Sequence, residues 1–416
     1  MLTSSKERRF REPGYGWVVM GLFWALNAVA FALVHSLGIV LPSMTEDLAL
    51  TPIDSGWLGS SYFLLICLMS VLMSSWLSRY EPNRVVMLSA LVASVLIFAQ
   101  GWAPDFAIAM AARVGFVVMV IARMSVGPLL IQRWFPPQRL SLVNSIAMVT
   151  MDASLAIAMA VLPFIMDLLQ GWRNTYYAFG LLSLLVSLVW VAFGRGQPKP
   201  EYTRAAIAQE RSPLRAILRY KEVWLLGIGV FGGTAVWSAF STFWPTYVTS
   251  VYGVPLTGAG LVLGLGSVGA VIGYLVCSSL AERIGRRKPI ILVAGVALPL
   301  LNVATLWTGS MPALAALSLV RGFTWMFLPI VMTVPYELPN IKPREVAVAT
   351  ALIMTLMAAG GALGPLLAGF LAKSLDSLYF ALAPMCALPI TLSIAGLLLP
   401  ETGRVKREMP KAEQAG

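Results

Sequence analysis

The chain has 416 residues, of which 58% are hydrophobic and only 12% charged, and its mean hydropathy is +0.79. Soluble domains hold about 25% charged residues, so this composition excludes an ordinary soluble protein. The net charge of +11 comes from basic residues that lie between long apolar stretches. It therefore indicates membrane orientation and contact with anionic lipid, and we expect no nucleic-acid partner.

Long apolar stretches follow one another along the whole chain. The longest covers residues 223–281, which include no Asp, Glu, Lys or Arg and are divided by a turn at residues 252–255. One transmembrane helix needs about 20 residues, and in hydrocarbon each segment must satisfy its own backbone hydrogen bonds. We therefore predict twelve transmembrane helices, at residues 17–41, 54–77, 85–103, 106–132, 141–169, 175–193, 223–250, 256–280, 289–307, 312–336, 346–371 and 377–399.

One interruption, residues 194–222, is longer than the others and rich in charge and proline. We interpret it as a cytoplasmic linker. The predicted fold is an all-α integral membrane protein of two six-helix bundles, residues 1–193 and 223–416.

The basic residues are distributed unequally between the two sides of the membrane. Of the 30 Lys and Arg, 25 lie in the two tails and in the loops that follow even-numbered spans. Only Arg173 and Lys373 lie in the opposite loops, and Arg113, Arg123 and Arg321 lie within spans. The positive-inside rule then predicts a multi-pass protein of an inner (cytoplasmic) membrane with both termini in the cytoplasm.

The sequence indicates neither a cofactor nor a metal. Cys67, Cys277 and Cys386 all lie within predicted spans, without the spacing of a metal site or a disulfide framework. No P-loop is present, which disfavours transport driven by ATP. We expect a monomer that works with a small-molecule substrate, protons and the lipid bilayer.

The loop at residues 280–288 reads Leu-Ala-Glu-Arg-Ile-Gly-Arg-Arg-Lys and resembles the signature loop of the major facilitator superfamily, Gly-x-x-x-Asp-Arg-x-Gly-Arg-Arg/Lys. Residues 77–84 resemble a degraded copy of it. Further resemblances are Arg-Trp-Phe-Pro at 133–136, Gly-Trp-Arg at 171–173 and Pro-Glu-Thr-Gly at 400–403. The family implies a secondary transporter that alternates access to a central site between two bundles.

The resemblance implies that the signature loop gates this movement. A carboxylate can hold guanidinium groups through charge-assisted hydrogen bonds, and glycine permits a tight turn. The alternative is that these residues only orient the chain in the membrane. The candidate gating residues are Glu282, Arg283, Gly285, Arg286 and Arg287, with Arg79 and Arg84 in the degraded copy.

In this family the substrate path is lined mainly by spans 1, 4, 7 and 10. Arg123 lies about 15 Å from the cytoplasmic end of its span, and Asp152 lies at nearly the same depth in the next span. An isolated intramembrane charge needs a partner or a wet cavity. Either Arg123 binds an anionic substrate while Asp152 modulates it or carries a proton, or the two form a permanent structural ion pair.

Other candidates in these spans are less specific. Arg113 and Arg321 could bind or couple, or could satisfy helix carbonyls. His35, the single histidine, could carry a proton or could be a packed polar residue. The remaining candidates for substrate binding, which could also serve only in packing, are Asn27, Trp237, Phe240, Trp244 and Trp325.

The opening Gly-Tyr-Gly-Trp at 14–17 and the Arg-Trp-Phe-Pro motif are similar to those of monocarboxylate and oxalate/formate-type members, although span 8 lacks that group's charges. Span 5 lacks the Gly-Pro motif of drug/proton antiporters. Three intramembrane arginines favour a small organic anion, a carboxylate, moved with protons. The alternative is a proton-coupled exporter of cationic or amphipathic compounds with Asp152 as the acid.

Overall fold

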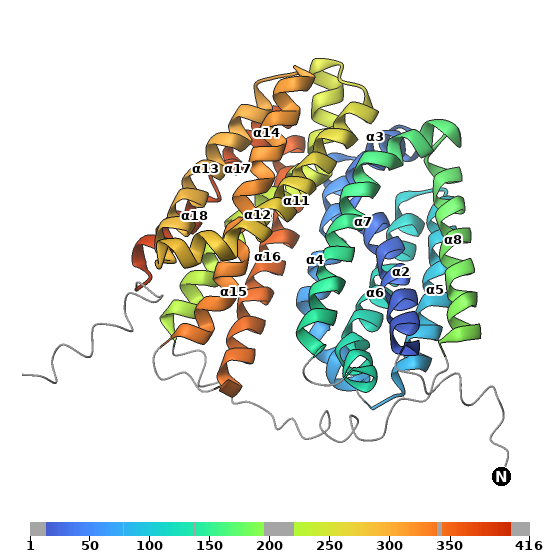
Figure 1. Cartoon of the computed structure of the whole chain (residues 1–416). Helices are drawn as coiled ribbons and strands as arrows, with labels where there is room; N and C mark the ends of the chain where they lie inside the picture. Colours follow the sequence, from blue (N-terminus) through green and yellow to red (C-terminus); the bar gives the residue numbers. More distant parts are fainter. Residues whose placement is uncertain (1–13, 78, 136–138, 195–219, 339–342, 401–416) are drawn as a thin grey trace, which may run out of the picture. The chain divides into compact units, whose positions relative to one another are not determined.

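The computed structural model describes residues 14–77, 79–135, 139–194, 220–338 and 343–400, and every regular element within these ranges is a helix (Figure 1). The described residues contain twelve helical stretches that are long and apolar enough to cross a membrane. The predicted all-α class and the predicted number of spans are confirmed.

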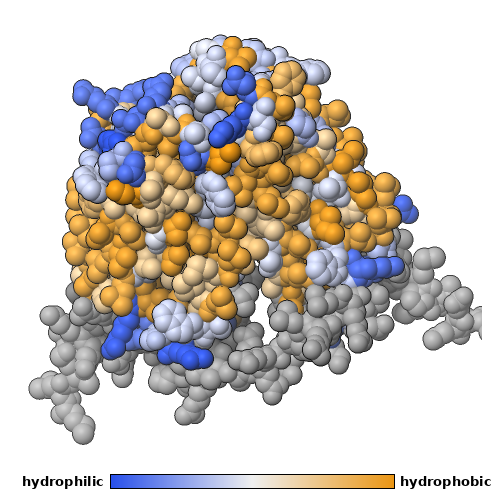
Figure 2. Space-filling model, turned by 180° about the vertical axis from the view of Figure 1, so that it is seen from behind, coloured by the Kyte–Doolittle hydropathy of each residue, from blue (hydrophilic) through white to orange (hydrophobic). Residues whose placement is uncertain are grey.

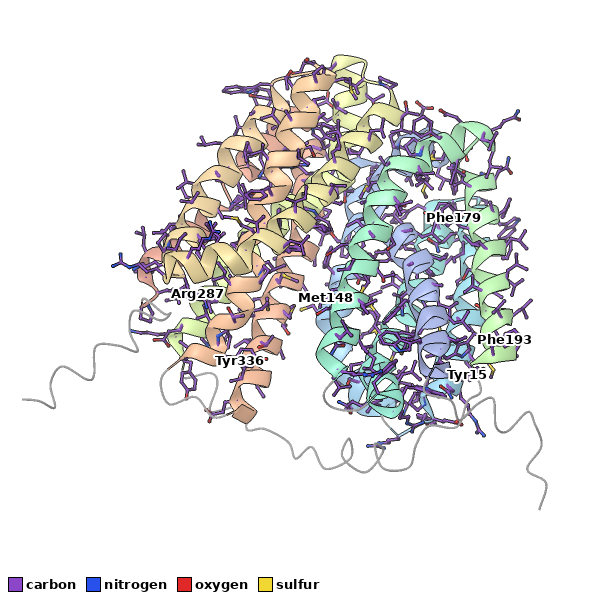
Figure 3. All side chains as sticks on the ribbon, viewed as in Figure 1. Tyr15, Met148, Phe179, Phe193, Arg287 and Tyr336 are labelled. Atoms are coloured by element: carbon purple, nitrogen blue, oxygen red, sulfur yellow. The ribbon has the colours of Figure 1, made fainter. Side chains whose placement is uncertain are left out.

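The first compact unit comprises Met1–Leu50, Leu68–Ala158 and Leu162–Glu210. Its helices are α2 (Tyr15–His35), α3 (Leu37–Leu48), the second part of α4 (Pro52–Leu77), α5 (Pro82–Trp102), α6 (Phe106–Trp134), most of α7 (Leu140–Leu168) and α8 (Trp172–Phe193). Helix α5 packs along both α6 and α8. Tyr15 at the start of α2 donates a hydrogen bond to the carbonyl of Phe193 at the end of α8 (Figure 3).

The second compact unit comprises Thr51–Cys67, Met159–Val161 and Arg211–Gly416. Besides the first part of α4, its helices are α11 (Lys221–Tyr252), α12 (Leu256–Ile284), α13 (Lys288–Leu306), α14 (Met311–Phe323), the 3₁₀ helix η2 (Thr324–Met326), α15 (Phe327–Glu337), α16 (Pro343–Leu375), α17 (Leu378–Met385) and α18 (Ile390–Leu398). The most extensive packing joins α11 to α16 and α12 to α14.

Helix α4 is divided between the two units after Cys67. Within the second unit, Ser60 Oγ donates to the carbonyl of Ala362 on α16 at 2.5 Å. A methyl group added at Gly59 would lie 2.6 Å from Thr242 Oγ1 on α11, so the helices approach closely here. Most of the predicted linker lies outside the described residues, and the division into residues 1–193 and 223–416 stays a prediction.

Three predicted spans are interrupted. Span 1 was expected to continue to residue 41, but α2 ends at His35, where Ser36 Oγ donates to the carbonyl of Ala32 at 2.5 Å. Such back-bonding by serine bends helices. Span 10 is broken by η2, and span 12 is broken after Met385 into α17 and α18, next to Pro389, which has no N–H to donate.

The helix ends follow from local turn chemistry. Asp105 caps α6 by accepting a hydrogen bond from the Ile108 N–H at 2.9 Å. Gly253 and Gly285 follow α11 and α12 with φ of 65° and 66°, a left-handed conformation that favours glycine. The stretches between such ends are apolar, and Figure 2 shows hydrophobic residues over much of the face that it presents. These surfaces suit a hydrocarbon solvent.

Candidate substrate-binding site

Arg123 and Asn27 lie together inside the first unit. Arg123 Nε donates to Asn27 Oδ1 at 3.0 Å, and its Nη2 donates to the carbonyl of Leu26 at 3.1 Å. The side chain is 1% exposed. Two hydrogen bonds from one guanidinium therefore join α6 to α2, and they use donors that a substrate would otherwise occupy.

The alternative in which Arg123 and Asp152 form a permanent ion pair has no counterpart among the described contacts. Among the described residues, ion pairs join Arg84 to Glu81 and Arg173 to Asp47. Asp152 is half-buried on α7. Met148, one turn earlier on the same face, is 66% exposed and is labelled in Figure 3. This face of α7 is therefore not sealed within the first unit.

Arg113 lies where α2 is interrupted. Its Nη2 donates to the carbonyl of Val34 at 3.1 Å, and its side chain is buried. The last carbonyls of a helix lack intrahelical donors, and an arginine can satisfy them. His35 is also buried here, with its ring 4.2 Å from that of Phe31. This geometry supports the structural alternative for Arg113.

Arg321 is held differently from the other two arginines. It is half-buried near the end of α14, and its guanidinium lies over the ring of Phe240 at 5.6 Å. In the described part of the chain its side chain makes one hydrogen bond, from Nη1 to Asn302 Oδ1 at the long distance of 3.5 Å. Guanidinium has five N–H donors, so most of its capacity remains for a ligand.

Aromatic side chains from three helices meet beside Arg321 in the second unit. Trp237 on α11 lies 6.5 Å from Trp325 on η2 and 6.1 Å from Phe63 on α4, measured between ring centroids. All three rings are half-buried. The structure thus brings together four of the predicted binding residues: Arg321, Phe240, Trp237 and Trp325. Trp244 is instead buried and donates to the carbonyl of Thr305 at 3.4 Å.

The family model described as Major Facilitator Superfamily matches residues 23–340 and again residues 259–415. The chain belongs to the major facilitator superfamily.

Relatives in this superfamily are transporters of small molecules. The chain is 26% identical over 384 residues to human monocarboxylate transporter 11, and this alignment covers 86% of this chain and 78% of that protein. It is 23% identical over 325 residues to a probable galactarate/D-glucarate transporter of Escherichia coli (strain K12), and this alignment covers 66% of this chain and 70% of that protein. A solved bacterial homologue of the human lysosomal transporter Spinster shares the fold, with a TM-score of 0.77, 17% identity and coverage of 92% and 96%.

The signature loop of the superfamily is described in part. Gly285 makes the left-handed turn after α12, Arg283 and Arg286 are exposed, and Arg287 is half-buried. The side chain of Glu282 lies outside the described residues, so the predicted gating contact stays a prediction. In the degraded copy, Arg79 is exposed, while Arg84 pairs at 3.0 Å with Glu81 in the same turn.

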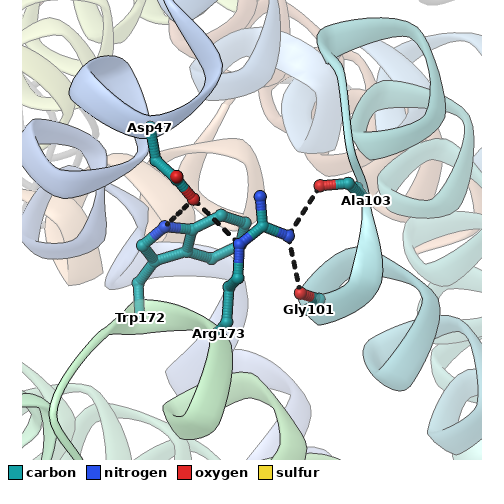
Figure 4. A network of polar contacts seen from close by, with 5 residues as sticks. All are labelled: Asp47, Gly101, Ala103, Trp172 and Arg173. Carbon is teal, nitrogen blue, oxygen red and sulfur yellow. Dashed lines mark hydrogen bonds and ion pairs between the residues drawn. The ribbon is translucent and has the colours of Figure 1, made fainter.

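The Gly-Trp-Arg motif forms a network within the first unit (Figure 4). Arg173 donates to Asp47 at 2.8 Å and to the carbonyls of Gly101 and Ala103 at 3.1 and 2.7 Å. Trp172 Nε1 donates to the same carboxylate at 3.1 Å. The network joins the end of α3, the end of α5 and the start of α8, so this superfamily motif has a structural role here.

Two residues of the candidate site were not predicted from the sequence. Asn302 is a lone amide within span 9, which was not among the spans considered for the substrate path. Its polarity in an apolar span was the available signal. Phe63 is one of many aromatic residues in the spans, and nothing in the sequence distinguishes it.

Proposed function

We propose that this transporter moves a small organic carboxylate together with protons by alternating access. The observation that carries the proposal is Arg321, a half-buried guanidinium with one long side-chain hydrogen bond among the described residues. A carboxylate matches guanidinium geometry and forms charge-assisted hydrogen bonds with it. Relatives named as carriers of monocarboxylates and of galactarate or glucarate support an anionic substrate.

In this proposal, Asn302 positions Arg321. Arginine only donates hydrogen bonds, so the amide must turn its Oδ1 toward Arg321, which settles the usual ambiguity between amide oxygen and nitrogen. Asn302 is 3% exposed, and its Nδ2 has no hydrogen-bond partner among the described residues. A buried amide with an unsatisfied donor is costly, and an acceptor that arrives with the substrate would satisfy it.

We further propose that Arg123 and Asn27 hold α2 against α6 and do not bind the substrate charge. The two described hydrogen bonds of Arg123 support this structural interpretation. Asp152 is then the best placed proton carrier, because it is half-buried on an accessible face of α7 and none of the described ion pairs includes it. His35 is a second candidate, but it lies deeper, beside the interruption of α2.

The test is uptake of carboxylates into proteoliposomes with an inwardly directed proton gradient. Wild-type protein should take up acetate or lactate, and Arg321→Ala should reduce uptake at least about tenfold, the effect of losing one charge-assisted contact of 1.4 kcal/mol or more. Lys373→Ala removes an exposed positive charge from the same unit and should leave uptake unchanged. Asp152→Asn should abolish stimulation by the proton gradient.

Two results would contradict the proposal. One is unchanged carboxylate uptake in Arg321→Ala. The other is proton-driven movement of a cationic dye with no carboxylate flux, which would favour the exporter alternative.

A further inference from the structure

Two pairs of side chains connect α11 to span 10, one helical turn apart. Arg321 lies over Phe240, and Trp325, four residues later, meets Trp237, three residues earlier on α11. Residue numbers rise along span 10 and fall along α11, so the helices are antiparallel and the pairs are stacked along them. One turn of a helix rises about 5.4 Å, which separates the charged pair from the aromatic pair by roughly that distance.

The aromatic pair is presented by a break in the helix. Trp325 is the middle residue of η2, the 3₁₀ turn Thr324–Met326 that separates α14 from α15. A 3₁₀ stretch inside a helix often marks a functional position, and transporters place substrates at discontinuous helices. Gly233 on α11 lies beside this ring, and a methyl group added there would be in ordinary contact with it at 3.9 Å. Phe63 adds a third ring, edge-on to Trp237 at 85°.

The charge on this part of the second unit is a single positive one. Residues 223–281 contain no Asp, Glu, Lys or Arg, and Arg321 is the one charged residue within 289–336. A substrate with one carboxylate can be neutralised here. A second carboxylate one turn away would lie against the rings of Trp237 and Trp325, whose faces carry negative potential.

From this arrangement we propose that the substrate is an aromatic monocarboxylate. Its carboxylate binds Arg321, and its ring packs on Trp237 and Trp325. This inference rests on the proposed function, because it takes a carboxylate as the transported group. Aromatic pairs in edge-to-face or offset geometry are favoured beyond the area they bury, by an amount equal to about two- to twelvefold in affinity. An aromatic acid should therefore bind tighter than a saturated acid of equal size.

The experiment is thermal stabilisation of the purified full chain by four related compounds. Phenylacetate has the charge and the flat ring, cyclohexylacetate has the charge and a saturated ring, acetate has the charge alone, and 2-phenylethanol has the ring alone. A ligand that binds the folded protein raises the unfolding midpoint by an amount that depends on the ratio of its concentration to its Kd, so titration gives each apparent Kd. Phenylacetate should bind about two- to twelvefold tighter than cyclohexylacetate, acetate should bind more weakly than both, and 2-phenylethanol should bind weakest.

Variants separate the charge from the ring. Trp325→Leu should remove the preference for phenylacetate over cyclohexylacetate while acetate binding persists, and Trp325→Phe should keep the preference. Arg321→Ala should abolish stabilisation by all three acids. Trp307→Leu removes an exposed tryptophan of the same unit and should change neither.

The outcomes distinguish the aromatic substrate class from the proposed transport of carboxylates. If acetate binds as tightly as phenylacetate, or if both ring acids bind equally, the aromatic substrate class is wrong while the carboxylate transporter stands. A preference that survives in Trp325→Leu would likewise overturn the assignment of the ring site. If none of the acids binds and no carboxylate is transported, the proposed function itself is wrong.

Discussion

The three arginines within spans differ in what their guanidinium groups contact. Arg113 donates to a carbonyl at a helix interruption, and Arg123 donates to an amide and a carbonyl of α2. Arg321 makes one long hydrogen bond and lies over a ring. In hydrocarbon a guanidinium group needs hydrogen-bond acceptors or an opposite charge. Arg113 and Arg123 find acceptors on the backbone and side chains of their own unit. Arg321 makes the longest of these hydrogen bonds, so its guanidinium is the best placed of the three to bind a substrate.

At Arg123 we predict a loss of stability that follows its hydrogen bonds. Arg123→Ala leaves Asn27 Oδ1 and the Leu26 carbonyl without their described donor, which costs about 1–3 kcal/mol for a buried polar group. The midpoint of thermal unfolding should fall, and carboxylate binding should persist in the protein that remains folded. Differential scanning fluorimetry and acetate titration measure the two properties.

A double variant tests the partner of Arg123. Asn27→Leu replaces the amide with an apolar group of similar size, so its combination with Arg123→Ala should cost less than the sum of the single changes. Asp152→Asn should give no such recovery, because none of the described ion pairs includes Asp152. Recovery with Asp152→Asn, or loss of acetate binding in folded Arg123→Ala, would instead support an ion pair or a binding role.

At the scale of elements, glycines allow α16 to lie directly against α11 in the second unit. A methyl group at Gly360 would lie 2.3 Å from the carbonyl oxygen of Phe231, and one at Gly364 would lie 2.1 Å from that of Ala235. These are backbone atoms, which cannot move aside as a flexible side chain can. Small residues at such seams are how membrane helices gain close packing without a hydrophobic driving force.

We therefore predict that Gly364→Ala destabilises the protein by about 1–3 kcal/mol, the usual cost of overpacking, through separation of α16 from α11. The matched control is Gly21→Ala on α2, where an added methyl group meets nothing within 4 Å. That change should be neutral or slightly stabilising, since alanine is the better helix former. Thermal midpoints of the two variants in the same detergent make the comparison, and equal midpoints would contradict the proposed seam.

At the scale of the whole molecule, the distribution of basic residues predicts the orientation. The tails and the linker hold many of the 25 basic residues assigned to one side, and a bacterial-type inner membrane would place that side in the cytoplasm. Lys199 and Lys411 lie in these segments, outside the described residues, so this prediction rests on charge alone.

Single cysteines at Lys199 and Lys411, introduced after removal of the three native thiols, should be protected from an impermeant reagent in whole cells. Ser310→Cys, in an exposed loop between α13 and α14, should be labelled and serves as the positive control. Labelling of Lys199→Cys or Lys411→Cys from outside intact cells would show that the predicted orientation is inverted or incomplete.

The sequence by itself determined the class and the number of spans, because hydrocarbon requires each span to be a continuous apolar stretch that satisfies its own backbone hydrogen bonds. It also determined the family, because the signature motifs are local runs of residues in the loops. It also indicated which polar residues lie inside spans. Their partners were decided by the tertiary structure. Asn27 and Arg123 are 96 residues apart in the chain. The depth of Asp152 in its span suggested a contact with Arg123, but none of the described ion pairs includes Asp152.

The same reason applies to the candidate site in the second unit. The sequence predicted Arg321, Trp237 and Trp325 separately, but the antiparallel course of α11 and span 10 brings Arg321 to Phe240 and, one turn away, Trp325 on η2 to Trp237. Helix interruptions in membranes depend on neighbours that satisfy the released backbone groups, so hydropathy does not reveal them. Asn302 enters the site for a similar reason, since only the packing of α13 against α14 brings its amide to Arg321.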